Sequence, residues 1–152
     1  MLYLVRHGKA GSRRDFDGDD RMRPLSAAGQ RQARALAPKL VAAGVHTFVS
    51  SPYLRCIETL QPAAKEADST VDIDKCLGEG RAGVDVIELM STLPDGSALC
   101  SHGDVIPEVV AALERRGCEI MTAPDWRKGT VWVISRDRDR YTTAHVWPPP
   151  ES

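Results

Sequence analysis

The sequence predicts an α/β fold in three αβα layers, with a mostly parallel central sheet and an antiparallel contribution. Short, continuous apolar runs alternate with amphipathic helical patterns, as expected for parallel strands that are buried on both faces. Near the C-terminus, two runs of alternating polarity follow each other, which is typical of an antiparallel hairpin. The 152 residues, 42% of them hydrophobic, suffice for one domain. We expect it over residues 1–147, with a short C-terminal tail over 148–152.

The first predicted strand is the apolar run LYLV at residues 2–5. Ser26 is a candidate N-cap for the first helix, whose apolar residues recur at helical spacing until Gly44. Pro38 lies inside this pattern and is expected to kink the helix. The first two elements are therefore a buried strand and an amphipathic helix.

The second predicted strand covers HTFVS at residues 46–50. We expect Ser51 to cap the helix that follows, with Pro52 at its first position. Pro62 is expected to bend or end that helix. This unit repeats the strand–helix order of the first.

The third predicted strand is SALCS at residues 97–101, and the helical pattern after it ends at Gly117. The alternating runs TVWVIS at 130–135 and YTTAHVW at 141–147 then predict two antiparallel strands. The charged segment RDRDR at 136–140 joins them.

Charge and cysteine content exclude several functional classes. With 20 basic and 21 acidic residues, the chain has no general field that would hold nucleic acid or a membrane. The four cysteines have neither C-x-x-C spacing nor a neighbouring histidine, so we expect no disulfide framework and no zinc site. The acidic run at residues 15–20 lacks the glycine position and terminal glutamate of a calcium loop, so a solvated loop is expected. We predict a cytoplasmic protein with no metal and no cofactor.

Polar residues follow the ends of the predicted strands. Arg6 and His7 come after the first strand, Arg55 lies in the first turn of the helix after the second, and His102 follows the third. Open α/β sheets bind ligands beyond the carboxyl ends of their strands, so we expect these side chains at one rim. Guanidinium groups grip oxyanions, and a helix N-terminus adds oriented N–H groups. The pattern predicts a phosphate pocket, where Gly8 allows close approach of the backbone.

Two histidines in such a pocket predict phosphoryl transfer. A neutral imidazole, with an unperturbed pKa of roughly 6.5, is a nucleophile near neutral pH. One histidine could accept a phosphoryl group, while the other and the arginines stabilise the transferring oxygens without a metal. Water would then release the phosphate.

The segments VRHGKA, RPLSAAGQRQA, SSPYLRCIETL and CSHGD resemble the successive signatures of the histidine phosphatase superfamily, which has the phosphoglycerate mutase-like fold. The short length and the pattern from Ser50 to Thr59 are most similar to the SixA-type phosphohistidine phosphatases. The resemblance implies that His7 is the nucleophile, that Arg6 and Arg55 clamp the phosphate, and that His102 is the second pocket histidine.

The resemblance leaves the remaining site residues open. It implies an acidic proton donor, for which Glu79 in LGEGR is the first candidate and Asp104 the second. Lys9 either adds positive potential at the pocket mouth or is a solvated lysine. Arg23 either reaches the substrate or braces the start of the helix.

The resemblance to SixA-type enzymes implies a phosphorylated protein partner, of the histidine-containing phosphotransfer type, as substrate. The chain has little room for a lid, and an open pocket suits a phosphorylated side chain. The first alternative is a phosphatase of a small phosphoester or nucleotide in the same superfamily. The second is a module that binds phosphorylated ligands without turning them over. Neither nucleic acid nor a membrane is expected as a partner.

Overall fold

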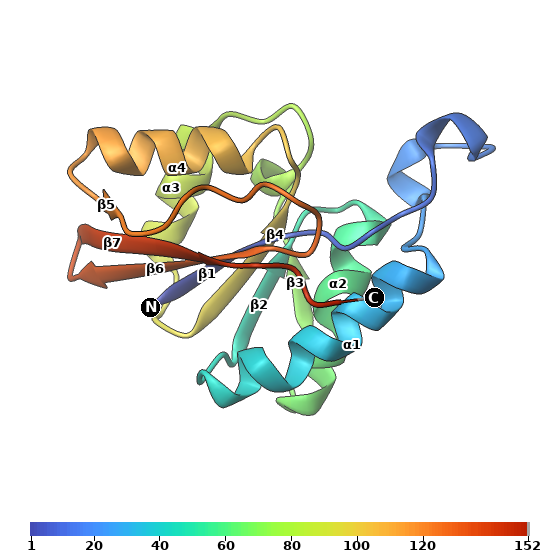
Figure 1. Ribbon diagram of the computed structural model, residues 1–152, viewed down its shortest axis with the longest axis horizontal. Helices are drawn as coiled ribbons and strands as arrows, with labels where there is room; N and C mark the ends of the chain where they lie inside the picture. Colours follow the sequence, from blue (N-terminus) through green and yellow to red (C-terminus); the bar gives the residue numbers. More distant parts are fainter. Residues whose placement is uncertain (152) are drawn as a thin grey trace.

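The computed structural model describes residues 1–151, so Ser152, the end of the predicted tail, lies outside the described residues. Figure 1 shows a central sheet with helices on both faces. The strands are β1 (Leu2–Arg6), β2 (Thr47–Ser50), β3 (Val71–Ile73), β4 (Ser97–Ser101), β5 (Glu119–Ile120), β6 (Val131–Asp137) and β7 (Arg140–Trp147). The α-helices are α1 (Ala27–Ala42), α2 (Leu54–Glu66), α3 (Gly83–Thr92) and α4 (Ile106–Arg115). The predicted three-layer α/β fold is confirmed.

The sheet has the strand order β3-β2-β4-β1-β6-β7-β5. Its core is parallel, because β4 pairs with β1 on one side and with β2 on the other. The antiparallel part is the β6–β7 hairpin, which joins the sheet through β1. The parallel centre and antiparallel contribution that the sequence predicts are therefore both present.

Alternate side chains of the strands enter two separate cores. From β1, Leu2 and Leu4 pack with α3 and α4, whereas Tyr3 and Val5 pack with α1 and α2. This alternation follows from the pleat of a strand, whose successive side chains point to opposite faces. A strand covered on both faces must be apolar at every position, which explains the uninterrupted run LYLV.

The first predicted helix agrees with the structure at both ends. Ser26 is the N-cap of α1, and its hydroxyl accepts a hydrogen bond from the Gly29 N–H at 3.2 Å. Gly44, with φ of +93°, follows the C-terminal end in the left-handed conformation.

The predicted start of the second helix is wrong, and of the two effects expected of Pro62 the structure rules out an end to the helix. α2 begins at Leu54, and its N-cap is Tyr53, which makes no side-chain capping bond. Ser51 lies two residues before this N-cap, and its hydroxyl accepts from the Tyr53 N–H at 3.2 Å and lies 2.9 Å from a ring nitrogen of His102. Pro62 does not end the helix, which continues to Glu66.

Several elements have no counterpart in the sequence prediction. β3 and β5 are strands of three and two residues at the edges of the sheet, too short to show an alternating pattern. α3 starts at Gly83 without a side-chain capping bond, and so lacks the usual signal of a helix start. Among the helices of residues 1–151, the structure contains none with the length and apolar character needed to cross a bilayer.

Candidate active site

The parallel register brings the predicted residues to one edge of the sheet. Arg6 of β1 lies opposite Ser101 of β4, and Ser50 of β2 lies opposite Cys100. The residues that follow these strands are therefore neighbours. The backbone N–H of His7 donates to the Ser101 carbonyl at 3.2 Å, and the His7 and His102 rings meet edge to face with centroids 5.5 Å apart.

His7 is buried, with one ring nitrogen tied to its own chain. Nδ1 lies 2.8 Å from the carbonyl oxygen of Gly8. A carbonyl can only accept, so this nitrogen carries the proton and Nε2 keeps a free lone pair. Burial lowers the pKa of His7 to about 3, with smaller contributions from the charges of Arg55 and Arg6. The ring is therefore neutral and nucleophilic at physiological pH.

Two contacts fix the backbone around His7. The Gly8 N–H donates to Thr59 Oγ1 at 3.0 Å, and that hydroxyl donates to the Arg55 carbonyl at 2.7 Å. These bonds join the loop after β1 to helix α2. They hold the histidine in register with Arg55.

Arg6 lies at the end of β1, and its guanidinium packs against Gly103 in the turn between β4 and α4. Its Nη1 donates to the carbonyl of Trp126. A Cβ at Gly103 would lie 2.7 Å from Arg6 Cζ, so a larger residue there would displace the guanidinium. Burial lowers the pKa of Arg6, and the charge of Asp104 opposes this shift.

Arg55 is buried almost completely, and the terminal nitrogens of its guanidinium have polar partners. Nη1 donates to the Asp20 carbonyl at 3.0 Å, and Nη2 contacts the carboxylates of Asp20 at 3.3 Å and Glu79 at 3.4 Å. Its guanidinium also stacks over the Tyr53 ring, with Cζ 4.9 Å from the centroid. These partners compensate the burial of the charge.

Three site residues carry polar atoms with no hydrogen-bond partner. Within residues 1–151 these atoms are Arg6 Nε, Arg55 Nε and His102 Nδ1, and each is buried. A buried polar group without a partner is costly, so such groups require an explanation. The two guanidinium nitrogens are donors, and together with a protonated Nδ1 they form a set that an oxyanion can satisfy.

The two candidate acids are placed differently. Glu79 joins the site, where Oε1 accepts from Arg13 Nη2 at 2.6 Å and Oε2 contacts Arg55. Asp104 accepts from the backbone N–H of Gly80 at 2.8 Å, and its charge acts on Arg6. Both carboxylates lie beside the arginines, but both already have partners.

The structure places Lys9 and Arg23 at the margin of the site. Arg23 is buried, and it binds Asp20 through Nε at 2.9 Å and donates to the Gly11 carbonyl. These contacts brace the loop before α1, the second of the two expected roles. Lys9 is exposed. Burial lowers the pKa of Lys128, and the charges of Arg6, Arg23 and Lys9 lower it further.

Two residues of the site escape the sequence reasoning. Asp20 belongs to the run interpreted as a solvated loop, yet its carboxylate contacts Arg55, Arg23 and Arg13. Although burial opposes the shift, these cations lower the pKa of Asp20. Its position three residues before Arg23 is the sequence signal for an ion pair. Ser51, expected as a helix cap, is the other.

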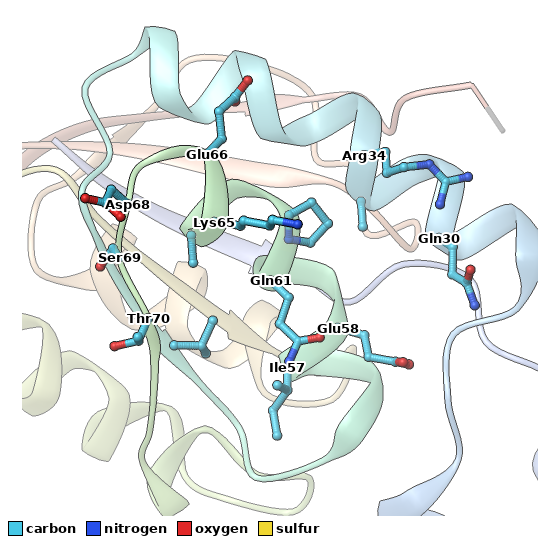
Figure 2. A pocket seen from close by; sticks show the side chains of 14 residues that line it. Gln30, Arg34, Ile57, Glu58, Gln61, Lys65, Glu66, Asp68, Ser69 and Thr70 are labelled. Atoms are coloured by element: carbon cyan, nitrogen blue, oxygen red, sulfur yellow. The ribbon is translucent and has the colours of Figure 1, made fainter.

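A large surface groove lies away from the histidines. Figure 2 shows it between α1, which contributes Gln30 and Arg34, and α2, which contributes Glu58 and Lys65. The groove has a volume of about 1140 Å³, and both acidic and basic side chains line it. Among the described residues that line it, none is a predicted site residue.

Comparisons with known proteins agree with this architecture. The SixA protein histidine phosphatase, complexed with tungstate, superimposes with a TM-score of 0.75 at 20% identity, covering 99% of this chain and 96% of that one. A mycobacterial glucosyl-3-phosphoglycerate phosphatase with inorganic phosphate gives 0.65 at 18% identity, covering 97% and 95%. At these identities the likeness shows the fold.

The sequence comparisons go further. An 8-oxo-(d)GTP phosphatase of Mycolicibacterium smegmatis is 32% identical over 157 residues, which cover 99% of this chain and 48% of the relative. The chain thus spans about half the length of that relative. The model of the histidine phosphatase superfamily (branch 1) matches residues 2–85, more than half of the sequence and the part that carries Arg6, His7, Arg55 and Glu79. The chain therefore belongs to the histidine phosphatase superfamily.

Proposed function

We propose that the protein is a phosphatase that passes a phosphoryl group first to His7 and then to water, without a metal ion. The observation that carries the proposal is the set of unpartnered polar atoms on Arg6, Arg55 and His102, around a histidine whose Nε2 keeps its lone pair. Two guanidiniums and an N–H group can neutralise the three equatorial oxygens of a transferring phosphoryl group. Family membership supports the same chemistry.

The reaction has two displacements. His7 Nε2 attacks phosphorus, a P–N bond forms, and the bond from phosphorus to the leaving group breaks with its electron pair going to that group. Water then attacks the phosphorus of phospho-His7. The P–N bond breaks, the imidazole recovers its lone pair, and inorganic phosphate leaves with the oxygen of the water.

The contacts of Glu79 favour substrates with good leaving groups. Both carboxylate oxygens face guanidiniums, Oε1 toward Arg13 and Oε2 toward Arg55, so protonating a leaving group would require breaking these contacts. An alkoxide needs a proton as it departs. The imidazole of a phosphohistidine, with a conjugate acid of pKa about 6.5, needs less help. Glu79 is therefore an auxiliary acid in this proposal, with Asp104 as the alternative.

We take phosphohistidine on a protein as the first candidate substrate. The likeness to SixA supports it. A nucleotide is the second candidate, because the relative at 32% identity acts on 8-oxo-(d)GTP and a phosphate leaving group, with a pKa of about 6, also needs little acid. Both candidates share a weakly basic leaving group.

Turnover of three substrates separates these possibilities. We expect kcat/KM to be highest for a phosphorylated histidine-containing phosphotransfer protein, lower for 8-oxo-dGTP, and lowest for an alkyl phosphomonoester such as glycerol 3-phosphate. Preference for 8-oxo-dGTP would support the second candidate. Preference for the alkyl ester would contradict the role given to Glu79.

Trapping of the intermediate tests the mechanism itself. Incubation with radiolabelled p-nitrophenyl phosphate should leave an acid-labile, base-stable phosphoryl group on the wild type and none on His7→Gln. Turnover should be unchanged by a chelator. A protein that binds phosphate but shows neither an adduct nor phosphate release would be a binding module instead, and inhibition by the chelator would refute the metal-free mechanism.

A further inference from the structure

We propose that Ser51 is a positioning residue, whose hydroxyl donates to Nε2 of His102 and thereby keeps the His102 proton on Nδ1, facing the phosphoryl group. The inference deepens the proposed function and rests on it for the role of His102. It concerns a residue that the sequence suggests only as a helix cap.

The geometry around Ser51 leaves its proton available for His102. Ser51 Oγ lies 2.9 Å from His102 Nε2, and both residues are buried. The same oxygen accepts a hydrogen bond from the Tyr53 N–H at 3.2 Å. Because a backbone N–H can only donate, that contact uses a lone pair of the hydroxyl and not its proton. The O–H is then free to point at Nε2.

A second group near Nε2 is a weaker donor. Cys56 Sγ lies 3.6 Å from Nε2 and 3.7 Å from the Ser101 carbonyl oxygen. A thiol has one proton and is a weak donor, and a carbonyl can only accept. The thiol proton therefore goes to Ser101, and Nε2 depends on the serine.

This arrangement makes the two histidines complementary. Both rings carry the proton on Nδ1. The Nδ1–H of His7 donates to the Gly8 carbonyl, and its Nε2 keeps a free lone pair. In His102, Nε2 accepts from Ser51. Its buried Nδ1–H has no hydrogen-bond partner among residues 1–151. One ring thus offers a nucleophile and the other a hydrogen-bond donor. The opposite tautomer of His102 would turn a lone pair toward the phosphoryl oxygens.

Nitrogen-15 NMR tests the tautomer without requiring turnover. In wild-type protein with 15N-labelled histidine, we expect His102 Nδ1 to resonate as a protonated, pyrrole-type nitrogen and Nε2 as an unprotonated, hydrogen-bonded one. In Ser51→Ala the two tautomers should mix, and in Ser51→Thr the wild-type pattern should return. A wild-type His102 with the proton on Nε2 would overturn the proposal.

Kinetics test the consequence, with the adjacent serine as a matched control. Ser50 Oγ donates to the Ser51 carbonyl at 2.8 Å, so Ser50→Ala removes a neighbouring buried hydroxyl whose bond goes to that carbonyl. Complete loss of an oxyanion donor costs about 100- to 1000-fold in kcat, and Ser51→Ala should cost less because it mixes the two His102 tautomers without removing the ring. For Ser51→Ala we expect kcat with p-nitrophenyl phosphate to fall about 10- to 100-fold, vanadate inhibition to weaken by a similar factor, and KM to change less than about threefold.

The outcomes separate the two proposals. Equal losses in Ser50→Ala and Ser51→Ala, or a Ser51→Ala enzyme with wild-type kcat, would overturn the positioning role. A wild-type protein with the expected His102 tautomer but no turnover would overturn the proposed phosphatase function and leave the tautomer assignment standing.

Discussion

The environment of His7 sets the protonation state of its ring. A histidine with an ordinary pKa would be partly protonated near pH 6.5, and a protonated ring has no lone pair to attack phosphorus. Burial, assisted by the neighbouring cations, lowers the pKa of His7 to about 3. Burial and the positive pocket together keep His7 neutral, as its proposed role as nucleophile requires.

This shift makes a prediction about stability. In the unfolded chain His7 takes up a proton near pH 6.5, but in the folded protein only near pH 3. The folded state therefore loses stability through His7 as the pH falls below 6.5, by at most about 1.4 kcal/mol per pH unit. Relative to His7→Gln, the wild type should lose about 2 kcal/mol of unfolding free energy between pH 8 and pH 5. Urea unfolding at both pH values checks it, and a pH-independent difference would contradict the shift.

Arg6 depends on a glycine that is distant from it in sequence. A Cβ on Gly103 would come within 2.7 Å of Arg6 Cζ and Nη2, so Gly103→Ala must push the guanidinium off its position. We expect kcat/KM to fall roughly 100-fold, the usual cost of a lost oxyanion donor, with little loss of fold. Gly11→Ala is the control, because a Cβ there meets open space. Wild-type kinetics in Gly103→Ala would show that Arg6 is not needed in this position.

The position of the loop after β1, which carries His7 and Gly8, depends on its contact with helix α1. A Cβ at Gly29 would lie 1.8 Å from the Lys9 carbonyl oxygen, and the Ser26 N–H donates to the same oxygen at 2.9 Å. The helix therefore touches the backbone that carries His7 and Gly8. A larger residue at this point would separate the two elements.

Gly29→Ala tests this contact through the sign of its effect. In an exposed helix interior the change would stabilise the protein by about 1 kcal/mol, because alanine has the higher helix propensity. Here the clash is with backbone, which cannot move aside locally, so we expect destabilisation by roughly 1–3 kcal/mol. Urea unfolding of both proteins measures this difference, and any gain in stability would contradict a close contact between Gly29 and the Lys9 carbonyl.

The sequence predicts the long elements of the sheet but not its short edge strands. β1, β2 and β4 are predictable because burial on both faces imposes a continuous apolar run, and the β6–β7 hairpin because its strands show an alternating pattern. β3 has three residues, two of them exposed, so no period develops. The edge strands and the uncapped helix α3 are stabilised by tertiary contacts, which cannot be deduced from the local sequence.

The same reasoning explains which site residues the sequence predicts. Arg6, His7, Arg55 and His102 follow strand ends, where topology alone brings them together. Asp20 does not follow from this rule. Ser51 comes directly after β2, so the rule places it at the same edge of the sheet, but its role depends on the partner that its hydroxyl contacts in the fold. The Ser51 hydroxyl contacts His102 as well as the N–H of the α2 N-cap residue Tyr53, and the sequence does not reveal the contact with His102.

For the whole molecule, two cores enclose the sheet and also shield its thiols. Cys56 and Cys100 are fully buried in the core beneath α1 and α2, and Cys118 is buried beside α4. Burial raises the pKa of both Cys100 and Cys118. Cys76 is partly exposed, but burial and a hydrogen bond with Asp74 raise its pKa to about 12. A thiol reacts as the thiolate, so a raised pKa protects Cys76, Cys100 and Cys118. Cys56 is protected by its complete burial alone, because hydrogen bonds with Cys100 and His102 outweigh the effect of burial and lower its pKa.

Thiol reactivity should therefore report opening of the entire fold. At pH 8 in the reduced, native protein, we expect less than one thiol to react with Ellman's reagent within minutes, and all four cysteines of the sequence to react at once in guanidinium chloride. Saturating vanadate, which binds the folded state, should slow the native reaction in proportion to the stabilisation it provides. Rapid native modification of one thiol, abolished by Cys76→Ser, would mean that the segment before Glu79 opens independently of the two cores.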